Sequence, residues 1–218
     1  MALGSRQNAN TIFLNIIGGK ITQRVNEGTE GAKSRKLEKG PKSGTEVWEV
    51  EHDFVSGKIV DGGIKESEYG DRIELKLQDK DEYYVLTVNW DYSKLRDAIV
   101  KRLPNLDVEK PVEISCFPDR DTGQPVLMIR QGGEVVKYFW TRDQPGDLPE
   151  PTQKKVRNKV EWDWTDVDNF LFKEASDWFS QFEGDQKPAH QEAASDDYEE
   201  EEKKSSTGED TLDEDVPF

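Results

Sequence analysis

The residues best suited to bind a ligand by charge lie in residues 32–43, a short segment rich in lysine and arginine. It holds five bases and one acid in a chain whose formal net charge is −16. Such a local positive excess attracts phosphate groups, and binding there would release counterions. Phosphate contacts and a solvated loop with no binding role are equally good interpretations of this charge alone. The contacts predicted under the first interpretation are Lys33, Arg35, Lys36, Lys39 and Lys42, with Arg24 at the base of the loop.

A second group suited to binding is aromatic, and several of its members stand beside a base such as Lys137 or Arg142. Stacking of unpaired nucleobases on such side chains holds single-stranded nucleic acid in many proteins. Packing in a core is nevertheless the more common role of any one strand aromatic. Neighbouring Tyr83 and Tyr84 point to opposite faces of a strand, so only one of them can join a given platform. The group comprises Trp48, Tyr69, Tyr83, Tyr84, Trp90, Tyr138, Phe139 and Trp140, of which we expect Trp48, Tyr83 and Tyr138 to stack.

Groups that could carry out covalent chemistry are few. The chain has no P-loop and no G-x-G-x-x-G, G-x-S-x-G or H-E-x-x-H motif. His52 and His190 are its only histidines, and the single cysteine, Cys116, allows neither an intrachain disulfide nor the usual Cys/His zinc site. Asp119 and Asp121 could serve as a metal-binding nuclease pair, but their position beside a turn favours a role in shaping it. We therefore expect no catalytic residues, no metal and no cofactor.

Negative charge is concentrated towards the end of the chain. Residues 183–218 contain 14 acidic residues and three lysines, a net charge of −11, so the other 182 residues carry only −5. A segment of this composition cannot form a core, and we expect it to be a disordered acidic tail. No apolar run approaches the roughly 20 residues of a membrane span. Residues 1–10, a flexible lead, show no signal-peptide pattern, and the sequence thus predicts a cytoplasmic protein with no membrane partner.

Periodicity predicts strands over most of the body, residues 11–182, which we interpret as one domain. Apolar residues spaced by three and four indicate a helix over 91–103 and another over 164–182. Residues 26–44 are rich in glycine and nearly free of apolar residues, which predicts a long loop. Residues 143–151 are predicted to be a proline-rich connection. The expected strands are residues 11–17, 20–25, 45–55, 57–60, 72–78, 83–90, 111–117, 124–130 and 134–140.

Many short strands, with one helix in the middle and one at the end, predict a mainly β fold. The regular spacing of turns favours a small closed or nearly closed barrel over an α/β sheet. A helix inserted between strands is the arrangement of an OB-fold. A β-sandwich fits the same pattern, so the two architectures remain open.

The final residues resemble those of a known family. An acidic run is followed by a small aliphatic residue, proline and phenylalanine, which resembles the C-terminal tip of bacterial single-stranded DNA-binding proteins. In that family the tip docks on replication and repair proteins. The resemblance implies recruitment of a polymerase, helicase or nuclease through Asp213, Glu214, Asp215, Val216, Pro217 and Phe218.

The body is similar to a group of single-stranded DNA-binding proteins from tailed bacteriophages. The shared features begin with two Gly-Lys-Ile triplets on either side of a basic, glycine-rich loop. A Pro-Val strand, a Lys-Tyr-Phe-Trp strand end and a Leu-Pro stretch follow. That resemblance implies an OB-fold with an acidic tail, although this body lacks a strong positive charge. The matching residues are Gly19-Lys20-Ile21, Gly57-Lys58-Ile59, Pro111-Val112, Lys137 to Trp140 and Leu148-Pro149.

Together these features predict a protein that coats and protects single-stranded DNA during phage replication or recombination in a bacterial host cell. The body would bind the strand and the tail would recruit partners. A protein-interaction or chaperone module that binds no nucleic acid is the alternative, and a metal-dependent nuclease is a more distant one.

Overall fold

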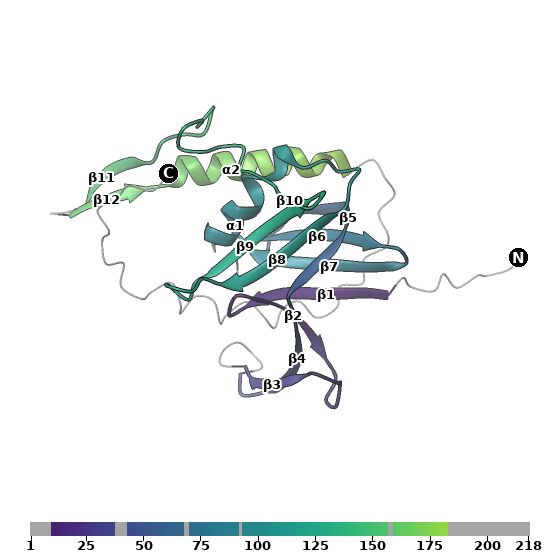
Figure 1. The fold of residues 1–218 in the computed structure, drawn as a ribbon. Helices are drawn as coiled ribbons and strands as arrows, with labels where there is room; N and C mark the ends of the chain where they lie inside the picture. Colours follow the sequence, from purple (N-terminus) through teal and green to yellow (C-terminus); the bar gives the residue numbers. More distant parts are fainter. Residues whose placement is uncertain (1–9, 38–42, 68–69, 92, 157–158, 183–218) are drawn as a thin grey trace, which may run out of the picture.

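The computed structural model of the chain describes residues 10–37, 43–67, 70–91, 93–156 and 159–182 (Figure 1). They form a mainly β fold, as the sequence predicts, with a ten-stranded sheet, a separate two-stranded sheet and two α-helices. The predicted lead and acidic tail lie outside the described residues, except for Asn10. None of the described helices is long and apolar enough to cross a membrane.

The large sheet has the order β10-β9-β8-β5-β6-β7-β1-β2-β4-β3, and its neighbouring strands are antiparallel except for the parallel pair β1 and β7. Its strands are β1 (Asn10–Ile17), β2 (Lys20–Val25), β3 (Lys33–Lys36), β4 (Glu46–His52), β5 (Phe54–Lys65), β6 (Arg72–Asp79), β7 (Glu82–Asn89), β8 (Val112–Pro118), β9 (Pro125–Gln131) and β10 (Glu134–Val135). The small sheet pairs β11 (Thr152–Val156) with β12 (Lys159–Asp163).

Strand β5 joins the two parts of the sheet because it pairs with two different strands along its length. Its first residues pair with β8, and the stretch from Lys58 to Lys65 pairs with β6. The pairing shifts between Ile59 and Asp61, an irregularity of the kind that bends and twists a strand. The strands on either side of β5 therefore curve around a common core.

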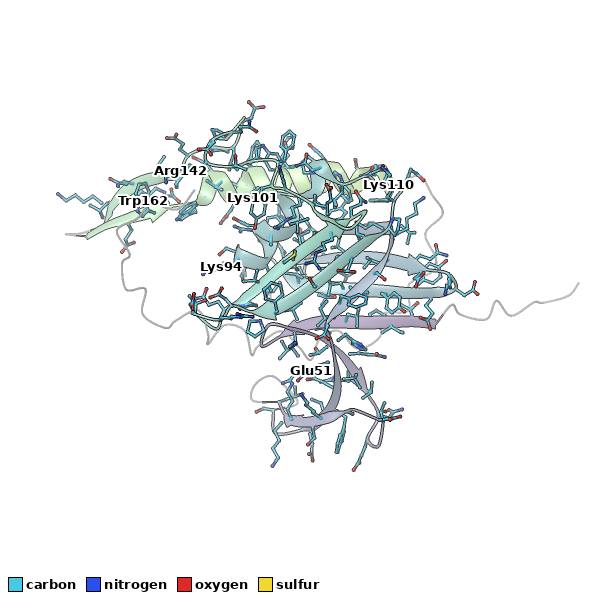
Figure 2. All side chains as sticks on the ribbon, in the orientation of Figure 1. Glu51, Lys94, Lys101, Lys110, Arg142 and Trp162 are labelled. Atoms are coloured by element: carbon cyan, nitrogen blue, oxygen red, sulfur yellow. The ribbon has the colours of Figure 1, made fainter. Side chains whose placement is uncertain are left out.

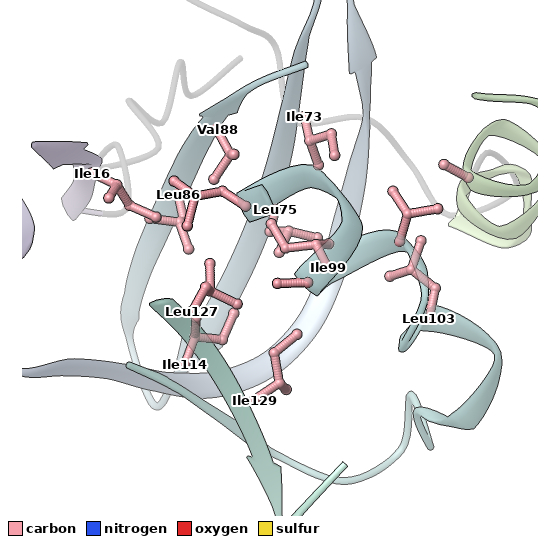
Figure 3. Packing of buried hydrophobic residues seen from close by; sticks show 14 of the residues in the cluster. Ile16, Ile73, Leu75, Leu86, Val88, Ile99, Leu103, Ile114, Leu127 and Ile129 are labelled. Atoms are coloured by element: carbon pink, nitrogen blue, oxygen red, sulfur yellow. The ribbon is translucent and has the colours of Figure 1, made fainter. Parts of the chain in front are cut away.

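Helix α1 (Ser93–Val100) covers that core. Leu95 and Ile99 of the helix are buried, and Leu103 in the following 3-10 turn (Leu103–Asn105) is buried with them. Figure 3 shows Ile99 beside Leu75, with core residues of β7, β8 and β9 around them. The predicted helix thus exists but ends earlier than expected, at Val100 rather than 103.

Helix α2 (Thr165–Phe179), followed by a 3-10 turn (Ser180–Phe182), packs on the same core through one face. The apolar spacing that predicts this helix is confirmed, and its buried residues are Val167, Leu171, Ala175 and Phe179. Rings of α2 also contact two tryptophans of the body edge to face: Trp90 with Phe172, and Trp140 with Phe170. Trp90 and Trp140 are buried, so these two aromatics belong to the core.

The strand pairings of the described residues do not close a barrel. β1 pairs with β7, and the sheet then continues through β2 to β4 and β3. These last two strands extend away from the body in Figure 1. The β1–β2 turn does reach β8, because a Cβ added to Gly19 would lie 2.9 Å from the backbone nitrogen of Pro118. The predicted hairpin of β1 and β2 is confirmed. The sequence predicts a closed or nearly closed barrel, and a closed barrel is not found among the described residues.

Two further sequence predictions, the loop over 26–44 and the strand over 134–140, need correction. The expected loop over 26–44 contains β3, which pairs with β4 and leads into buried Leu37. The expected strand over 134–140 stops at Val135. The Val136 N–H still bonds to the Ile129 carbonyl of β9, but Lys137 and Phe139 bond to residues that follow α1 instead. The sequence interpretation also missed the β11–β12 hairpin altogether.

Candidate nucleic-acid interface

Two of the predicted phosphate contacts are neutralised by acids of the neighbouring strand. Arg35 on β3 donates hydrogen bonds from Nε and Nη2 to the two carboxylate oxygens of Glu49 on β4, at 2.8 and 3.0 Å. Glu49 is buried. Lys33 pairs with Glu51 at 2.9 Å between Nζ and Oε1. Two of the five bases of the segment are therefore paired with acids across the β3–β4 ladder.

The other predicted phosphate contacts are dispersed. Arg24 on β2 lies opposite Glu49 in the β2–β4 register, so it too faces an acid. Lys36 is exposed at the end of β3. Lys39 and Lys42 lie outside the described residues. Among the described residues of this set, only Lys36 is both exposed and without an ion pair to another described residue.

The structure does not bring the three predicted stacking residues together. Through the β1–β2 and β2–β4 registers, Trp48 lies on the same face as Leu14, which is buried in the core. Tyr83 lies opposite Thr11, whose side chain points to the other face because side chains alternate along a strand. Trp48 and Tyr83 are both only half-exposed, and they cannot form one platform.

Tyr138 is the predicted stacking residue with the best-defined environment. Its side chain is 41% exposed. The guanidinium carbon of Arg102 lies 4.0 Å from the centroid of its ring, a cation–π contact. The ring is thus supported on a fixed cation and still reaches solvent, as a stacking residue for a nucleobase must.

Hydrogen bonds to its backbone hold the segment that carries Tyr138 against residues 101–105, which follow α1. The Phe139 N–H donates to the Lys101 carbonyl at 2.7 Å, and the Asn105 side-chain amide donates to the Lys137 carbonyl at 3.1 Å. Arg102 Nε donates to the Val136 carbonyl at 2.8 Å. The Val136 N–H still bonds to the Ile129 carbonyl of β9 at 2.9 Å, and beyond it these bonds take the place of the predicted strand ladder. They fix the backbone on both sides of Tyr138.

Arg102 is a buried cation that bonds to backbone carbonyls. In addition to the Val136 carbonyl, it donates from Nη1 to the Ala98 carbonyl at 2.5 Å. No carboxylate among the described residues forms an ion pair with it. A buried charge is costly unless it is hydrogen-bonded, and here the carbonyls and the Tyr138 ring supply that compensation. Sequence reasoning missed Arg102, because a lone arginine near a helix end has no local signal of burial.

Bases and a second exposed ring surround Tyr138 in the sequence. Lys137 and Phe139 are both exposed, and Phe139 packs edge to face on the buried Trp140. Figure 2 labels Lys101 and Arg142 on the side of the molecule where α1 lies, and the Lys101 amine there forms an ion pair with Asp97 at 2.9 Å. The arrangement offers aromatic surface and positive charge together, which is what binding of a flexible polyanion requires.

The residues that the sequence suggests for other chemistry have structural roles here. Asp119 accepts hydrogen bonds from the N–H of Thr122, the hydroxyl of Thr122 and the N–H of Asp121, which lower its pKa and shape the turn. His52 is hydrogen-bonded to Gln23 across β2 and β4, at 3.2 Å. The described residues contain no cluster of His, Cys, Asp or Glu that could hold a metal ion.

Comparisons with known proteins add no relative. No protein-family model matches the chain, and no curated protein or solved structure matches it either.

Proposed function

We propose that this protein binds single-stranded DNA through the surface around Tyr138. The observation that carries the proposal is the exposed Tyr138 ring held on the buried Arg102 guanidinium. The ring would stack on an unpaired base, a contact open to every base because each has a π face. Lys137 beside it would lie near the phosphates.

The topology supports an OB-type body for this function. β5, β6 and β7 form a meander, α1 follows, and β8 then returns to pair with the first half of β5 before β9. In an OB-fold the first of five strands pairs with the second and the fourth, and a helix follows the third. Strands β5 to β9, with α1 after β7, have this order. In this proposal β1 and β2 extend that unit beyond β7.

The acidic tail and its tip complete the proposed role. Coating of unpaired DNA during phage replication or recombination would be the task of the body. Recruitment of a polymerase, helicase or nuclease would be the task of residues 213–218, which resemble the tip of bacterial single-stranded DNA-binding proteins. We propose no catalysed reaction and no cofactor.

One observation favours the alternative of an interaction module that binds no nucleic acid. Lys33 and Arg35, half of the described cations in the predicted phosphate-binding set, already pair with Glu51 and Glu49. Under that alternative the β3–β4 arm is a neutral surface for another protein.

Binding of a labelled oligothymidine, followed by fluorescence anisotropy, separates the two functions. An oligonucleotide of about 20 nucleotides exceeds the site of one OB-fold, and a duplex of the same length is the control. We expect saturable binding of the single strand and weaker binding of the duplex. Absence of binding at low salt would favour the interaction module.

A further inference from the structure

The β11–β12 hairpin stands apart from the main sheet. Its strands pair with each other, from Thr152 opposite Asp163 to Val156 opposite Lys159, and with no other strand of the described chain. In Figure 1 it extends beyond the start of α2, away from the ten-stranded sheet. A two-stranded hairpin is only marginally stable by itself, so its apolar side chains would normally pack on the body.

One face of the hairpin instead exposes apolar surface. The register places Gln153 opposite Trp162 and Lys155 opposite Val160, which puts these four side chains on one face. Val160 is 62% exposed and Trp162 is 46% exposed. An exposed indole on a projecting strand adds little to folding, and it is well suited to stack on a ligand.

Charge identifies the kind of ligand. Residues 152–160 contain four basic residues and no acidic residue, in a chain of net charge −16. Lys155, on the face of Trp162, is exposed and has no ion pair among the described residues. Glu161 and Asp163 follow on β12, but the register places both on the opposite face, so on the Trp162 face Lys155 is not balanced by a paired acid. A cation beside an exposed indole complements the phosphates and bases of a single strand.

The opposite face of the hairpin ties it to α2. Lys154 forms an ion pair with Asp163, whose Oδ1 also accepts hydrogen bonds from the hydroxyl of Thr165 at 2.6 Å and its N–H at 3.2 Å. The bond from Lys154, followed by those from Thr165, lowers the pKa of Asp163 to about 2. The hairpin is therefore joined at the first turn of a helix that packs on the core.

We propose that the hairpin face formed by Lys155, Val160 and Trp162 is a second contact for single-stranded DNA, with Trp162 stacked on a base and Lys155 beside a phosphate. This inference rests on the proposed function and extends it to a named arm of the protein. The acidic tail of this chain is a competing occupant of the same positive face, and the experiment below distinguishes the two.

The test compares oligothymidine affinities of Trp162→Ala and Lys155→Glu in the full-length chain with two controls. Arg120→Glu makes the same charge change at an exposed position in the turn between β8 and β9, and Phe54→Ala removes an exposed ring from β5. We expect Trp162→Ala to weaken binding about 5- to 100-fold, the loss of one stacked base, and Trp162→Phe to retain most of it. Lys155→Glu should reduce the slope of log K against log salt by about 1 or more, whereas the controls should match the wild type.

Each outcome of these titrations supports or overturns the proposed hairpin contact. Wild-type binding with unchanged affinity in Trp162→Ala and Lys155→Glu would remove the hairpin from the site and leave the proposed function standing. Higher affinity in these variants would show that the hairpin holds the competing tail, which also overturns the inference. No binding by the wild type would refute the proposed function itself. Equal thermal unfolding temperatures of all variants would show that the body remains folded.

Discussion

The guanidinium of Arg102 supports the ring of Tyr138, with 4.0 Å between the guanidinium carbon and the ring centroid. One partner is a buried cation just after α1, and the other is an exposed aromatic 36 residues later in the chain. The contact fixes the orientation of the ring before any ligand arrives. Preorganisation of this kind reduces the entropy lost on binding.

Removal of the Tyr138 ring should weaken DNA binding without unfolding the protein. Tyr138→Ala is expected to raise Kd for oligothymidine about 5- to 100-fold, because a stacked base contributes about 1–3 kcal/mol. Tyr138→Phe keeps a ring on Arg102 and should stay close to the wild type. Anisotropy titrations measure both, with Phe54→Ala as the control for loss of an exposed aromatic. An affinity of Tyr138→Ala equal to that of the wild type would exclude Tyr138 from the site.

Substitutions of Arg35 and Lys36 on β3 should change different properties, the first the stability of the fold and the second the binding of DNA. Arg35→Gln leaves the buried Glu49 carboxylate without its bidentate partner, and we expect a loss of about 2 kcal/mol in the free energy of unfolding. Lys36→Gln removes an exposed charge and should leave stability nearly unchanged while reducing the salt dependence of binding. Chemical denaturation gives the stabilities. Equal stability of the two variants would contradict the structural role of the Arg35–Glu49 pair.

Two adjacent glycines of β5 should respond in opposite ways to alanine. A Cβ on Gly62 would lie 2.6 Å from Cε1 of Phe179 and 2.8 Å from the carbonyl oxygen of Glu74, whereas a Cβ on Gly63 meets no atom within 4 Å. We expect Gly62→Ala to destabilise the fold by about 1–3 kcal/mol, because α2 must shift from β5. Gly63→Ala should be neutral or slightly stabilising, since it restricts the unfolded chain. Thermal unfolding of the two variants checks the packing of α2, and similar melting temperatures would contradict it.

Deletion of residues 183–218 should raise the affinity for single strands. The segment has a net charge of −11, and a tethered polyanion competes with DNA for positive surface at high effective concentration. The gain should be largest at low salt, where screening is weakest. Titrations of the shortened and full-length chains at two salt concentrations measure it. An affinity that is equal or lower without the segment would rule out self-competition.

Local sequence patterns predict correctly the elements whose apolar residues alternate along a strand or recur at helical spacing. Ile73, Leu75 and Leu77 alternate with polar residues and are buried on β6, and the hairpin of β6 with β7 forms where it is predicted. The apolar stripe of α2 is likewise a local signal. In both cases burial of one face follows directly from the spacing of apolar residues.

The elements that the sequence predicts wrongly depend on partners that are distant in the sequence. β3 has hardly an apolar residue of its own, and it forms because β4 offers a free edge with Glu49 and Glu51 facing Arg35 and Lys33. Alternating acids in the strand over 45–55 were the signal that could have predicted these pairs. The segment of Tyr138 leaves the sheet because Arg102 and Lys101 bind its backbone, and no local pattern reports that.

The candidate site was only partly predictable for the same reason. The residue type of Tyr138 and its basic neighbour predict a stacking role, but its support by Arg102 is a contact between separate elements. The opposite faces of Trp48 and Tyr83 follow from the register through β1, β2 and β4. A register is set by pairing, so a single strand pattern cannot reveal which aromatics share a surface.

Intrinsic tryptophan fluorescence during titration with oligothymidine tests the central claim most directly. The chain has six tryptophans, and stacking of bases near the proposed surface should quench them. We predict saturable quenching, and an apparent binding constant whose logarithm falls linearly with the logarithm of the salt concentration, because bound phosphates release counterions. Fluorescence that stays constant at every salt concentration, with no bound oligonucleotide recovered in parallel, would contradict single-stranded DNA binding.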